Sequence, residues 1–277
     1  MEFTKMHGLG NDFIIVNRFN EEQRQDYSAL AAKLCDRHFG IGADGLILVL
    51  PSAEADIRMR IFNSDGSEPE MCGNGIRCFA KYVFAEGLIR QKIMRVETLA
   101  GIIVPEIILD NDKVVSVKVD MGEPQLERSQ IPMLGPYGNV LKEKITINDQ
   151  EFEISAVSMG NPHCIIFLAD LTDIQLEKWG PLLEKHKLFP NKTNVEFVQI
   201  KNREEAVVRV WERGAGVTLA CGTGACAVLV AGVQNDLLAR ESLIRLPGGD
   251  LMIHWAENNH LYMTGPAKEV FRGNIHV

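Results

Sequence analysis

The stretch "MCGNGIRC", residues 71–78, has a counterpart in "ACGTGACA", residues 220–227. Each places a cysteine directly before a Gly-x-Gly step that opens a helical pattern. The two stretches stand 149 residues apart, and at the same offset "RIF" in 60–62 aligns with "RVW" in 209–211. The register therefore extends beyond the glycine turns. This repeat predicts a chain built from two related halves.

Both halves show the same α/β pattern. A β-like run such as "DIRMRIF" or "AVVRVW" leads into the glycine turn and its helix. The apolar residues of the first helix recur at helical spacing and form one face, namely Ile76, Phe79, Ala80, Val83 and Phe84. Arg77 and Lys81 fall outside that face. The second helix, "GACAVLVAGV", is apolar on all sides, which favours a helix enclosed by the strands of its own sheet.

The composition favours a small-molecule substrate. The 277 residues carry a net charge of −8, and the pI is about 5.5. An acidic chain without a basic patch is poorly suited to binding nucleic acid or an anionic membrane. The sequence opens without an apolar leader, and its longest apolar run is too short to span a bilayer, so we expect a cytoplasmic protein.

The six cysteines are scattered along the chain, without C-x-x-C spacing and without histidines gathered around them. Because no secretory leader is apparent, this distribution indicates thiols rather than disulfides. It also gives no support to a zinc site, so no metal is predicted.

The duplicated cysteines point to proton transfer. A cysteine at a helix N-terminus is expected to have a lowered pKa, because the helix dipole favours the thiolate. The backbone N–H groups after each cysteine are suited to holding a carboxylate, and they belong to Gly73, Asn74, Gly222 and Thr223. If the related halves bring Cys72 and Cys221 to one cleft, a thiolate and a thiol can invert a carbon next to a carboxylate. This scheme is two-base racemisation or epimerisation without a cofactor.

Other classes of protein remain open on these residues alone. A cysteine hydrolase could pair either cysteine with His163, although the second cysteine would then be unexplained. A binding protein could use the same glycine turns, and a redox pair could use the same thiols. The glycine-rich stretches do not complete a nucleotide-binding motif.

Seven stretches together resemble the diaminopimelate epimerase family, in family order and over nearly the whole chain. They read "KMHGLGNDF" (5–13), "GIGADGLI" (40–47), "NSDGSEPEMCGNGIRCFA" (63–80), "VSMGNPHC" (157–164), "ERGAG" (212–216), "LACGTGACA" (219–227) and "LPGGDL" (246–251). The resemblance implies an α/β (α+β) fold of two pseudo-symmetric domains. Each would be a mixed, mainly antiparallel sheet wrapped around a central helix. It also implies domains of residues 1–118 with 264–277, and 119–263.

The same resemblance implies a reaction and a set of site residues. The reaction interconverts LL- and meso-2,6-diaminoheptanedioate without pyridoxal phosphate, with Cys72 and Cys221 as acid and base. His163 and Glu212 match positions thought to tune the two thiols. Residues expected at the substrate are Asn11, Asn63, Asn161, Asn194, Glu212 and Arg213. Proline-type racemases have a similar architecture and are the alternative, and a homodimer is possible.

Two positions depart from the family pattern. Some members carry Gln where this chain has Gly45, so a side-chain amide contact with substrate is missing there. Where the family stretch usually reads G-E-T, this chain has Gly216-Val217-Thr218. We expect the lost carboxylate to alter how that loop is anchored.

Overall fold

The structure, a computed structural model, describes residues 1–19 and 26–276. The chain divides into two compact units: unit 1 is Met1–Asp120 with Thr264–Val277, and unit 2 is Met121–Met263. Our predicted first crossing, after residue 118, falls inside strand β8 (Lys113–Asp120). That strand runs on because Val119 is fully buried. The crossing therefore follows the end of β8.

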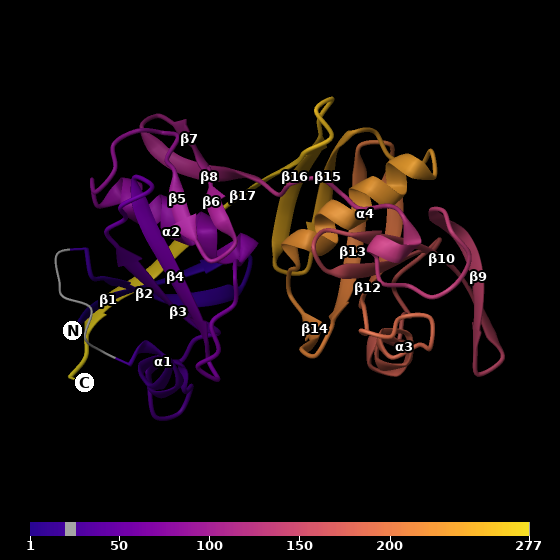
Figure 1. The fold of residues 1–277 in the computed structure, drawn as a ribbon, viewed down its shortest axis with the longest axis horizontal. Helices are drawn as coiled ribbons and strands as arrows, with labels where there is room; N and C mark the ends of the chain where they lie inside the picture. The colour runs from indigo at the N-terminus through magenta and orange to yellow at the C-terminus, as the bar shows by residue number, and fades with distance from the viewer. Residues whose placement is uncertain (20–25, 277) are drawn as a thin grey trace. The chain divides into compact units, whose positions relative to one another are not determined.

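Unit 1 is a mixed sheet with helices on its two faces (Figure 1). Its strands pair in the order β18-β1-β2-β3-β4-β5-β6, and β7 pairs with β8 as a hairpin. The elements are β1 (Glu2–Gly8), β2 (Asn11–Asn17), α1 (Tyr27–Cys35), β3 (Gly45–Leu50), β4 (Ile57–Asn63), α2 (Gly73–Ala85), β5 (Val96–Thr98), β6 (Gly101–Ile103), β7 (Glu106–Asp110), β8 and β18 (Lys268–Asn274).

Apolar side chains of unit 1 alternate between the two faces of its sheet, so that one face packs against α1 and the other against α2. Ile14, Val16 and Leu48 belong to a buried cluster that includes residues of α1. Ile47 and Ile61 point the other way, toward Gly75 in the first turn of α2. Because successive side chains of a strand point to opposite faces, one sheet buries both helices. Helix α2 contacts β1, β2, β3, β4, β7 and β8, so it is enclosed as predicted.

Unit 2 repeats this plan. Its strands pair in the order β17-β16-β15-β13-β12-β11-β10-β9, with β14 on β13. The elements are η1 (Arg128–Gln130), β9 (Val140–Ile147), β10 (Gln150–Ser158), β11 (Pro162–Phe167), α3 (Leu176–Glu184), β12 (Asn194–Asn202), β13 (Glu205–Glu212), β14 (Gly216–Thr218), α4 (Gly222–Gln234), β15 (Glu241–Leu246), β16 (Gly249–Trp255) and β17 (Leu261–Gly265), the last of which leads back into unit 1.

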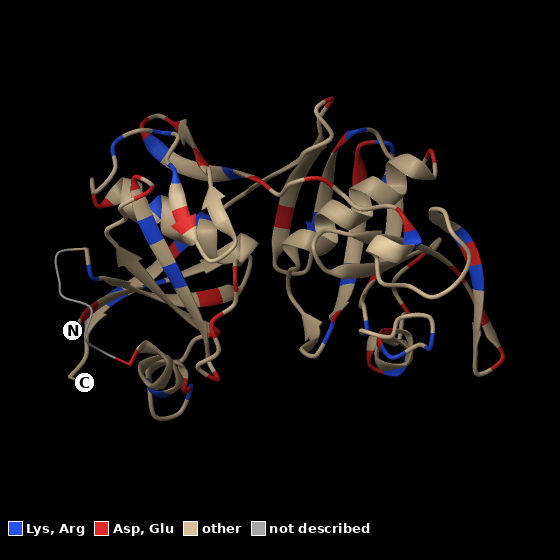
Figure 2. Cartoon of the chain, viewed as in Figure 1, with Lys and Arg blue, Asp and Glu red and all other residues tan. Residues whose placement is uncertain are grey.

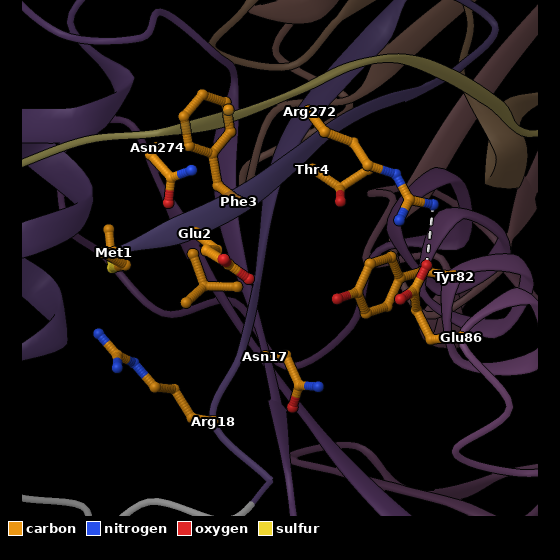
Figure 3. A pocket seen from close by; sticks show the side chains of 12 residues that line it. Met1, Glu2, Phe3, Thr4, Asn17, Arg18, Tyr82, Glu86, Arg272 and Asn274 are labelled. Atoms are coloured by element: carbon orange, nitrogen blue, oxygen red, sulfur yellow. Dashed lines mark ion pairs between the residues drawn. The ribbon is translucent and has the colours of Figure 1, made fainter.

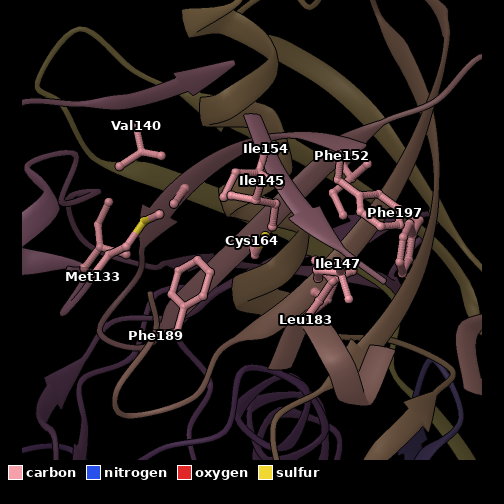
Figure 4. Packing of buried hydrophobic residues seen from close by; sticks show 14 of the residues in the cluster. Met133, Val140, Ile145, Ile147, Phe152, Ile154, Cys164, Leu183, Phe189 and Phe197 are labelled. Carbon is pink, nitrogen blue, oxygen red and sulfur yellow. The ribbon is translucent and has the colours of Figure 1, made fainter. Parts of the chain in front are cut away.

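Helix α4 is the buried centre of unit 2. All residues from Ala225 to Ala231 are fully buried, and the helix contacts β10, β11, β12, β15 and β16. A helix that is apolar on all sides requires such surroundings. The other face of the sheet packs on α3 through a cluster in which Phe152, Phe189 and Phe197 are among the largest side chains (Figure 4).

The strand directions confirm that the units are related. In unit 1 the parallel pairs are β2 with β3 and β4 with β5, and each encloses an α-helix in the sequence. In unit 2 the parallel pairs are β11 with β12 and β13 with β15, again around one α-helix each. The predicted fold of two pseudo-symmetric domains, each a mixed and mainly antiparallel sheet around a central helix, is thus confirmed.

Positively and negatively charged residues are interspersed along the chain in both units (Figure 2). Among the described residues, no helix combines the length and the apolar character needed to cross a bilayer.

Candidate functional site

Cys72 is the N-cap residue of α2. Its backbone is extended, with φ −139° and ψ 118°, and its Sγ accepts a hydrogen bond from the Gly75 N–H at 3.4 Å. An N-cap side chain normally satisfies one of the unpaired N–H groups of the first helical turn, and here the thiol does so. The N–H groups of Gly73 and Asn74 donate to no other group in the described part of the chain. They remain available to an anion, as the sequence predicted.

Two hydrogen-bonded side-chain amides, those of Asn11 and Asn74, lie next to Cys72. The Asn11 Oδ1 lies 3.7 Å from the Cys72 Sγ and accepts from Asn74 Nδ2 at 3.2 Å. Asn11 Nδ2 donates to Asp44 Oδ2 at 2.8 Å, which fixes the orientation of the Asn11 amide. Arg77 in turn donates to Asn74 Oδ1 at 2.9 Å. The structure therefore brings three of the predicted residues together at the start of α2.

Arg77 departs from the expected pattern, since it is fully buried although it lies outside the apolar face. Its guanidinium donates to the backbone oxygens of Gly73 at 2.9 Å and of Pro266 at 3.4 Å. Because α2 is enclosed on all sides, its polar face is inside the unit too. A buried guanidinium is stable there because backbone and side-chain oxygens satisfy its donors.

Cys221 occupies the equivalent place in unit 2. It is the N-cap residue of α4, with φ −123° and ψ 113°, and its Sγ accepts from the Gly224 N–H at 3.4 Å. The N–H groups of Gly222 and Thr223 have no hydrogen-bond acceptor among the described residues. The Thr223 Oγ1 lies 3.5 Å from the Cys221 Sγ. Each glycine turn thus combines a thiol with N–H donors that have no partner among the described residues.

The electrostatics at Cys221 correct one expectation. Burial raises the pKa of the Cys221 thiol well above its ordinary value, and the carboxylates of Glu212 and Glu196 raise that pKa further. The hydrogen bonds from Thr223 and Gly224 act in the opposite direction but do not prevail. The predicted lowering by the helix dipole is therefore wrong for Cys221. Desolvation and the two neighbouring carboxylates, one of them fully buried, outweigh the helix dipole.

Glu212 ends β13 beside this thiol. Its Oε1 accepts from Thr218 Oγ1 at 2.5 Å, across the β13–β14 hairpin. Burial raises the pKa of the Glu212 carboxyl, and the Thr218 hydrogen bond partly offsets that effect. The predicted neighbourhood of Glu212 and Cys221 is therefore present in unit 2.

His163 is connected to Cys221 through two other side chains. Its Nε2 lies 3.0 Å from Asn161 Oδ1, and Asn161 Nδ2 donates to Thr223 Oγ1 at 3.3 Å. Its Nδ1 lies 2.7 Å from Glu196 Oε1, and both of these side chains are fully buried. Glu196 was not among the site residues predicted from the sequence. The period-two spacing of Asn194 and Glu196 along one strand was the signal that could have found it.

Asn194 and Arg213 lie at the ends of neighbouring strands. The Asn194 Oδ1 accepts from the Arg213 N–H at 2.9 Å, and its Nδ2 donates to the Pro162 carbonyl at 3.0 Å. The Arg213 side chain is exposed and donates to Asn191 O at 3.1 Å. Asn63 ends β4 in unit 1, where its Nδ2 donates to Ser67 Oγ at 2.9 Å.

The two departures from the family pattern have structural explanations. A Cβ at Gly45 would lie 2.7 Å from the Phe62 carbonyl oxygen, so this backbone has no room for a glutamine. Val217 is half exposed in β14, where it pairs with Trp211. The loop is therefore anchored by a strand ladder and by Thr218, without a carboxylate at position 217.

A cavity lies elsewhere in unit 1 (Figure 3). It has a volume of about 640 Å³ and is lined by parts of β1, β2, β18 and α2. In Figure 3 the Glu86–Arg272 ion pair lies beside Tyr82, and the cavity contains none of the predicted site residues. The candidate site is therefore identified by its two N-cap thiols and their neighbouring groups, and not by this cavity.

The remaining cysteines have no comparable surroundings. Burial raises the pKa values of Cys35 and Cys78 to about 12 and also raises that of Cys164. Cys226 is fully buried inside α4. None of the six cysteines forms a disulfide.

Comparison with known proteins gives a family match over most of the chain. The family model described as diaminopimelate epimerase matches residues 3–127 and 155–270. The chain is 57% identical over 274 residues to the diaminopimelate epimerase of Pelotomaculum thermopropionicum, covering 99% of this chain and 98% of that protein. It is 59% identical over 274 residues to that of Desulforudis audaxviator, with the same coverage.

Solved structures share the fold at low sequence identity. A phenazine biosynthesis protein of the PhzF family from Bacillus anthracis has a TM-score of 0.73 at 17% identity, covering 100% of this chain and 99% of that chain. A probable proline racemase from Agrobacterium radiobacter has a TM-score of 0.68 at 13% identity, covering 100% and 93%. At these identities the likeness concerns the fold alone.

Proposed function

Because the chain belongs to the diaminopimelate epimerase family, we propose that Cys72 and Cys221 are the base and the acid of its reaction. The activity is that of an isomerase in lysine biosynthesis, which interconverts the LL and meso forms of diaminopimelate. The observation that carries the assignment is the equivalent N-cap position of both cysteines in two repeated units. The other α-helices of the described chain have Asp26 and Gln175 as their N-cap residues instead.

The proposed reaction is a pair of proton transfers at one α-carbon. A thiolate takes the α-proton, so a C–H bond breaks and an S–H bond forms. The other thiol gives its proton to the opposite face, which inverts the centre and leaves a thiolate. The reverse reaction exchanges the two roles. Because an α-proton is far less acidic than a thiol, the N–H groups at the two helix starts must stabilise the carboxylate as its charge grows.

We assign the resting thiol to Cys221 and the resting thiolate to Cys72. The Cys221 thiol keeps its proton because its pKa is raised by burial and by Glu212 and Glu196. The turn at Cys72 instead carries the buried guanidinium of Arg77. A neighbouring cation favours a thiolate, whereas a neighbouring carboxylate disfavours it.

The proposal also covers the end of the substrate that does not react. Diaminopimelate carries a second carboxylate and a second ammonium, which require a cation and an anion. Arg213 is the proposed partner of that carboxylate, because its exposed guanidinium can bind two oxygens at once. Asn63, Asn161 and Asn194 are proposed to contribute amides. Glu212 is proposed to accept from the ammonium, and Asn11 to lie beside the substrate.

The proline-type alternative is not favoured. The relatives named diaminopimelate epimerase are more than 50% identical to this chain, whereas the probable proline racemase shares only its fold at 13% identity. A hydrolase, a redox protein or a binding protein would each leave part of the repeated site, the two N-cap thiols with their N–H donors, without a function.

The first experiment follows deuterium incorporation at the α-carbon of LL-diaminopimelate in D2O by NMR. The reduced enzyme is expected to exchange the proton and to form the meso product. Cys72→Ala and Cys221→Ala are each expected to lose roughly 10²–10⁴-fold in epimerisation, the usual contribution of a positioned acid or base. Cys78→Ala and Cys226→Ala are the matched controls, since each removes a buried thiol inside the same two helices.

The outcomes separate the substrate from the residues. Conversion by the reduced enzyme that survives either N-cap substitution would refute the two-thiol assignment. A lack of exchange by folded, reduced enzyme would instead refute the substrate. Equal losses in the control variants would attribute the effect to packing of the helices.

A cytoplasmic location and a homodimer are further proposals for this chain. Reduced thiols are typical of the cytoplasm, and none of the six cysteines is in a disulfide. Val270 and Phe271 are exposed on β18, an edge strand of unit 1, and apolar side chains at an edge favour self-association. Fractionation of cells and light scattering of the purified protein test these two proposals.

A further inference from the structure

A buried acid–base pair lies behind Cys221. His163 and Glu196 are on the adjacent parallel strands β11 and β12, and neither side chain is exposed to solvent. The His163 Nδ1 lies 2.7 Å from Glu196 Oε1, and its Nε2 lies 3.0 Å from Asn161 Oδ1. The imidazole ring is therefore held between the Glu196 carboxyl and the Asn161 amide.

The pair is connected to the thiol by a continuous set of contacts. His163 Nε2 lies 3.0 Å from Asn161 Oδ1, Asn161 Nδ2 donates to Thr223 Oγ1 at 3.3 Å, and Thr223 Oγ1 lies 3.5 Å from Cys221 Sγ. The Thr223 hydroxyl accepts from Asn161, so its own hydrogen can be directed at the sulfur. The chain can therefore support a thiolate after Cys221 has given up its proton.

Glu196 also packs directly against the turn that holds the thiol. A Cβ placed on Gly224 would lie only 2.6 Å from Glu196 Oε1. The N–H of the same glycine donates to the Cys221 Sγ. Glu196 Oε2 is buried and lacks a partner in the described part of the chain. A fully buried carboxylate that is only half satisfied is costly, so packing alone does not account for it.

Unit 1 has the matching amides but the opposite charge. Asn11 and Asn74 stand at the positions equivalent to Asn161 and Thr223. In unit 1 Asn11 contacts the Cys72 Sγ and accepts from Asn74, whereas in unit 2 Thr223 contacts the Cys221 Sγ and accepts from Asn161. That chain ends at the guanidinium of Arg77, which donates to Asn74. The two repeated hydrogen-bond chains thus end in a cation at one thiol and in an anion at the other.

We propose that Glu196 is a positioning residue of the proposed reaction, which keeps Cys221 protonated so that this thiol starts as the acid. It acts by its charge at the α4 turn and by holding His163, and it does not touch the substrate. The inference rests on the proposed two-thiol function. In the described part of unit 2, Glu212 on β13 and Glu196 on β12 are the charged side chains close to this thiol, and His163 on β11 contacts Glu196. In agreement, burial and the carboxylates of Glu212 and Glu196 raise the pKa of Cys221.

The test measures the alkylation rate of Cys221 by iodoacetamide against pH, without substrate, and locates the label by peptide mapping. Only the thiolate reacts appreciably, so the profile reports its formation. In Glu196→Gln the profile is expected to move to lower pH by roughly one unit, which is about a tenfold faster reaction at fixed pH. The kcat is expected to fall at least roughly tenfold, with KM changed less than about twofold.

Glu184→Gln is the matched control, because Glu184 is also a buried glutamate of unit 2. Its Oε2 accepts a hydrogen bond from Trp211 Nε1 at 2.8 Å and not from the Cys221 group. The alkylation profile of Glu184→Gln against pH should therefore match that of the wild type. Glu196→Asp keeps the charge and is expected to restore most of the wild-type profile. If Glu196→Gln does not fold, the alkylation profile of Glu196→Asp is measured in its place.

An alkylation profile of folded Glu196→Gln that coincides with that of the wild type would overturn the proposal. A profile that moves equally in Glu184→Gln would overturn it as well, because the effect would then be general. The labelling needs no substrate. A failure of the diaminopimelate reaction would therefore be recognised separately, in the deuterium experiment.

Discussion

At the scale of single residues, the thiols differ through their neighbours. Glu212 is an instructive case, because burial raises the pKa of its carboxyl. Ionising such a group costs more in the folded protein than in the unfolded chain. Stability is therefore lost as the pH rises from the unfolded pKa, about 4.3, through the raised folded pKa. Glu212→Gln removes this cost, so its gain in thermal midpoint over the wild type should be larger at pH 8 than at pH 4, as followed by circular dichroism.

Glu151→Gln provides the comparison for Glu212, since Glu151 is 58% exposed on β10. Its midpoint relative to the wild type should depend little on pH. If the thermal midpoint of Glu212→Gln differs from that of the wild type by the same amount at pH 4 and pH 8, ionising the Glu212 carboxyl does not destabilise the folded protein.

At the scale of elements, an ion network holds the strands behind Asn11. Burial tends to raise the pKa of Asp12, but hydrogen bonds from Arg37 and Lys5 prevail and lower it to about 2. These contacts connect β1, β2 and the segment between α1 and β3. A lowered pKa stabilises the fold above the unfolded value, about 3.9, and this contribution is lost as the pH falls toward 2. Asp12→Asn should therefore lose about 2 kcal/mol at pH 7, and about half of that at pH 3.

Urea unfolding at the two pH values measures this loss. All three tryptophans, Trp179, Trp211 and Trp255, lie in unit 2. Far-ultraviolet circular dichroism is therefore the readout, because tryptophan fluorescence would miss unit 1. A destabilisation of equal size at pH 7 and pH 3 would contradict the argument from Asp12.

At the scale of the whole molecule, two related units carry thiols with opposite electrostatics. Cys72 is partly exposed beside a buried guanidinium, whereas Cys221 is 5% exposed and has a pKa raised by burial and by two carboxylates. At pH 7 and without substrate, limited iodoacetamide should modify Cys72 at least roughly tenfold faster than Cys221. Peptide mapping over time checks the order. Faster labelling of Cys221 would reverse the assignment of base and acid at rest.

Much of the fold follows from local patterns. The repeat at an offset of 149, the glycine turns and the apolar helical stretch at 224–233 predict two units with enclosed helices. These signals are local, because helix burial and helix starts depend on the spacing of residues within one turn or strand. The boundary at Asp120 was missed by two residues, because a strand ends where its packing ends.

The sequence by itself determined the two N-cap cysteines and the amides expected near them. Only the tertiary structure decided the charges around each thiol. Arg77 is buried because α2 is enclosed, and Glu196 reaches the α4 turn because β11 and β12 pair in parallel. A pKa depends on desolvation and on charges brought close by the fold, at separations in sequence that no spacing rule covers. The reaction type could therefore be predicted from the sequence. Which cysteine starts as the thiolate and which as the thiol depends on how the chain packs around them.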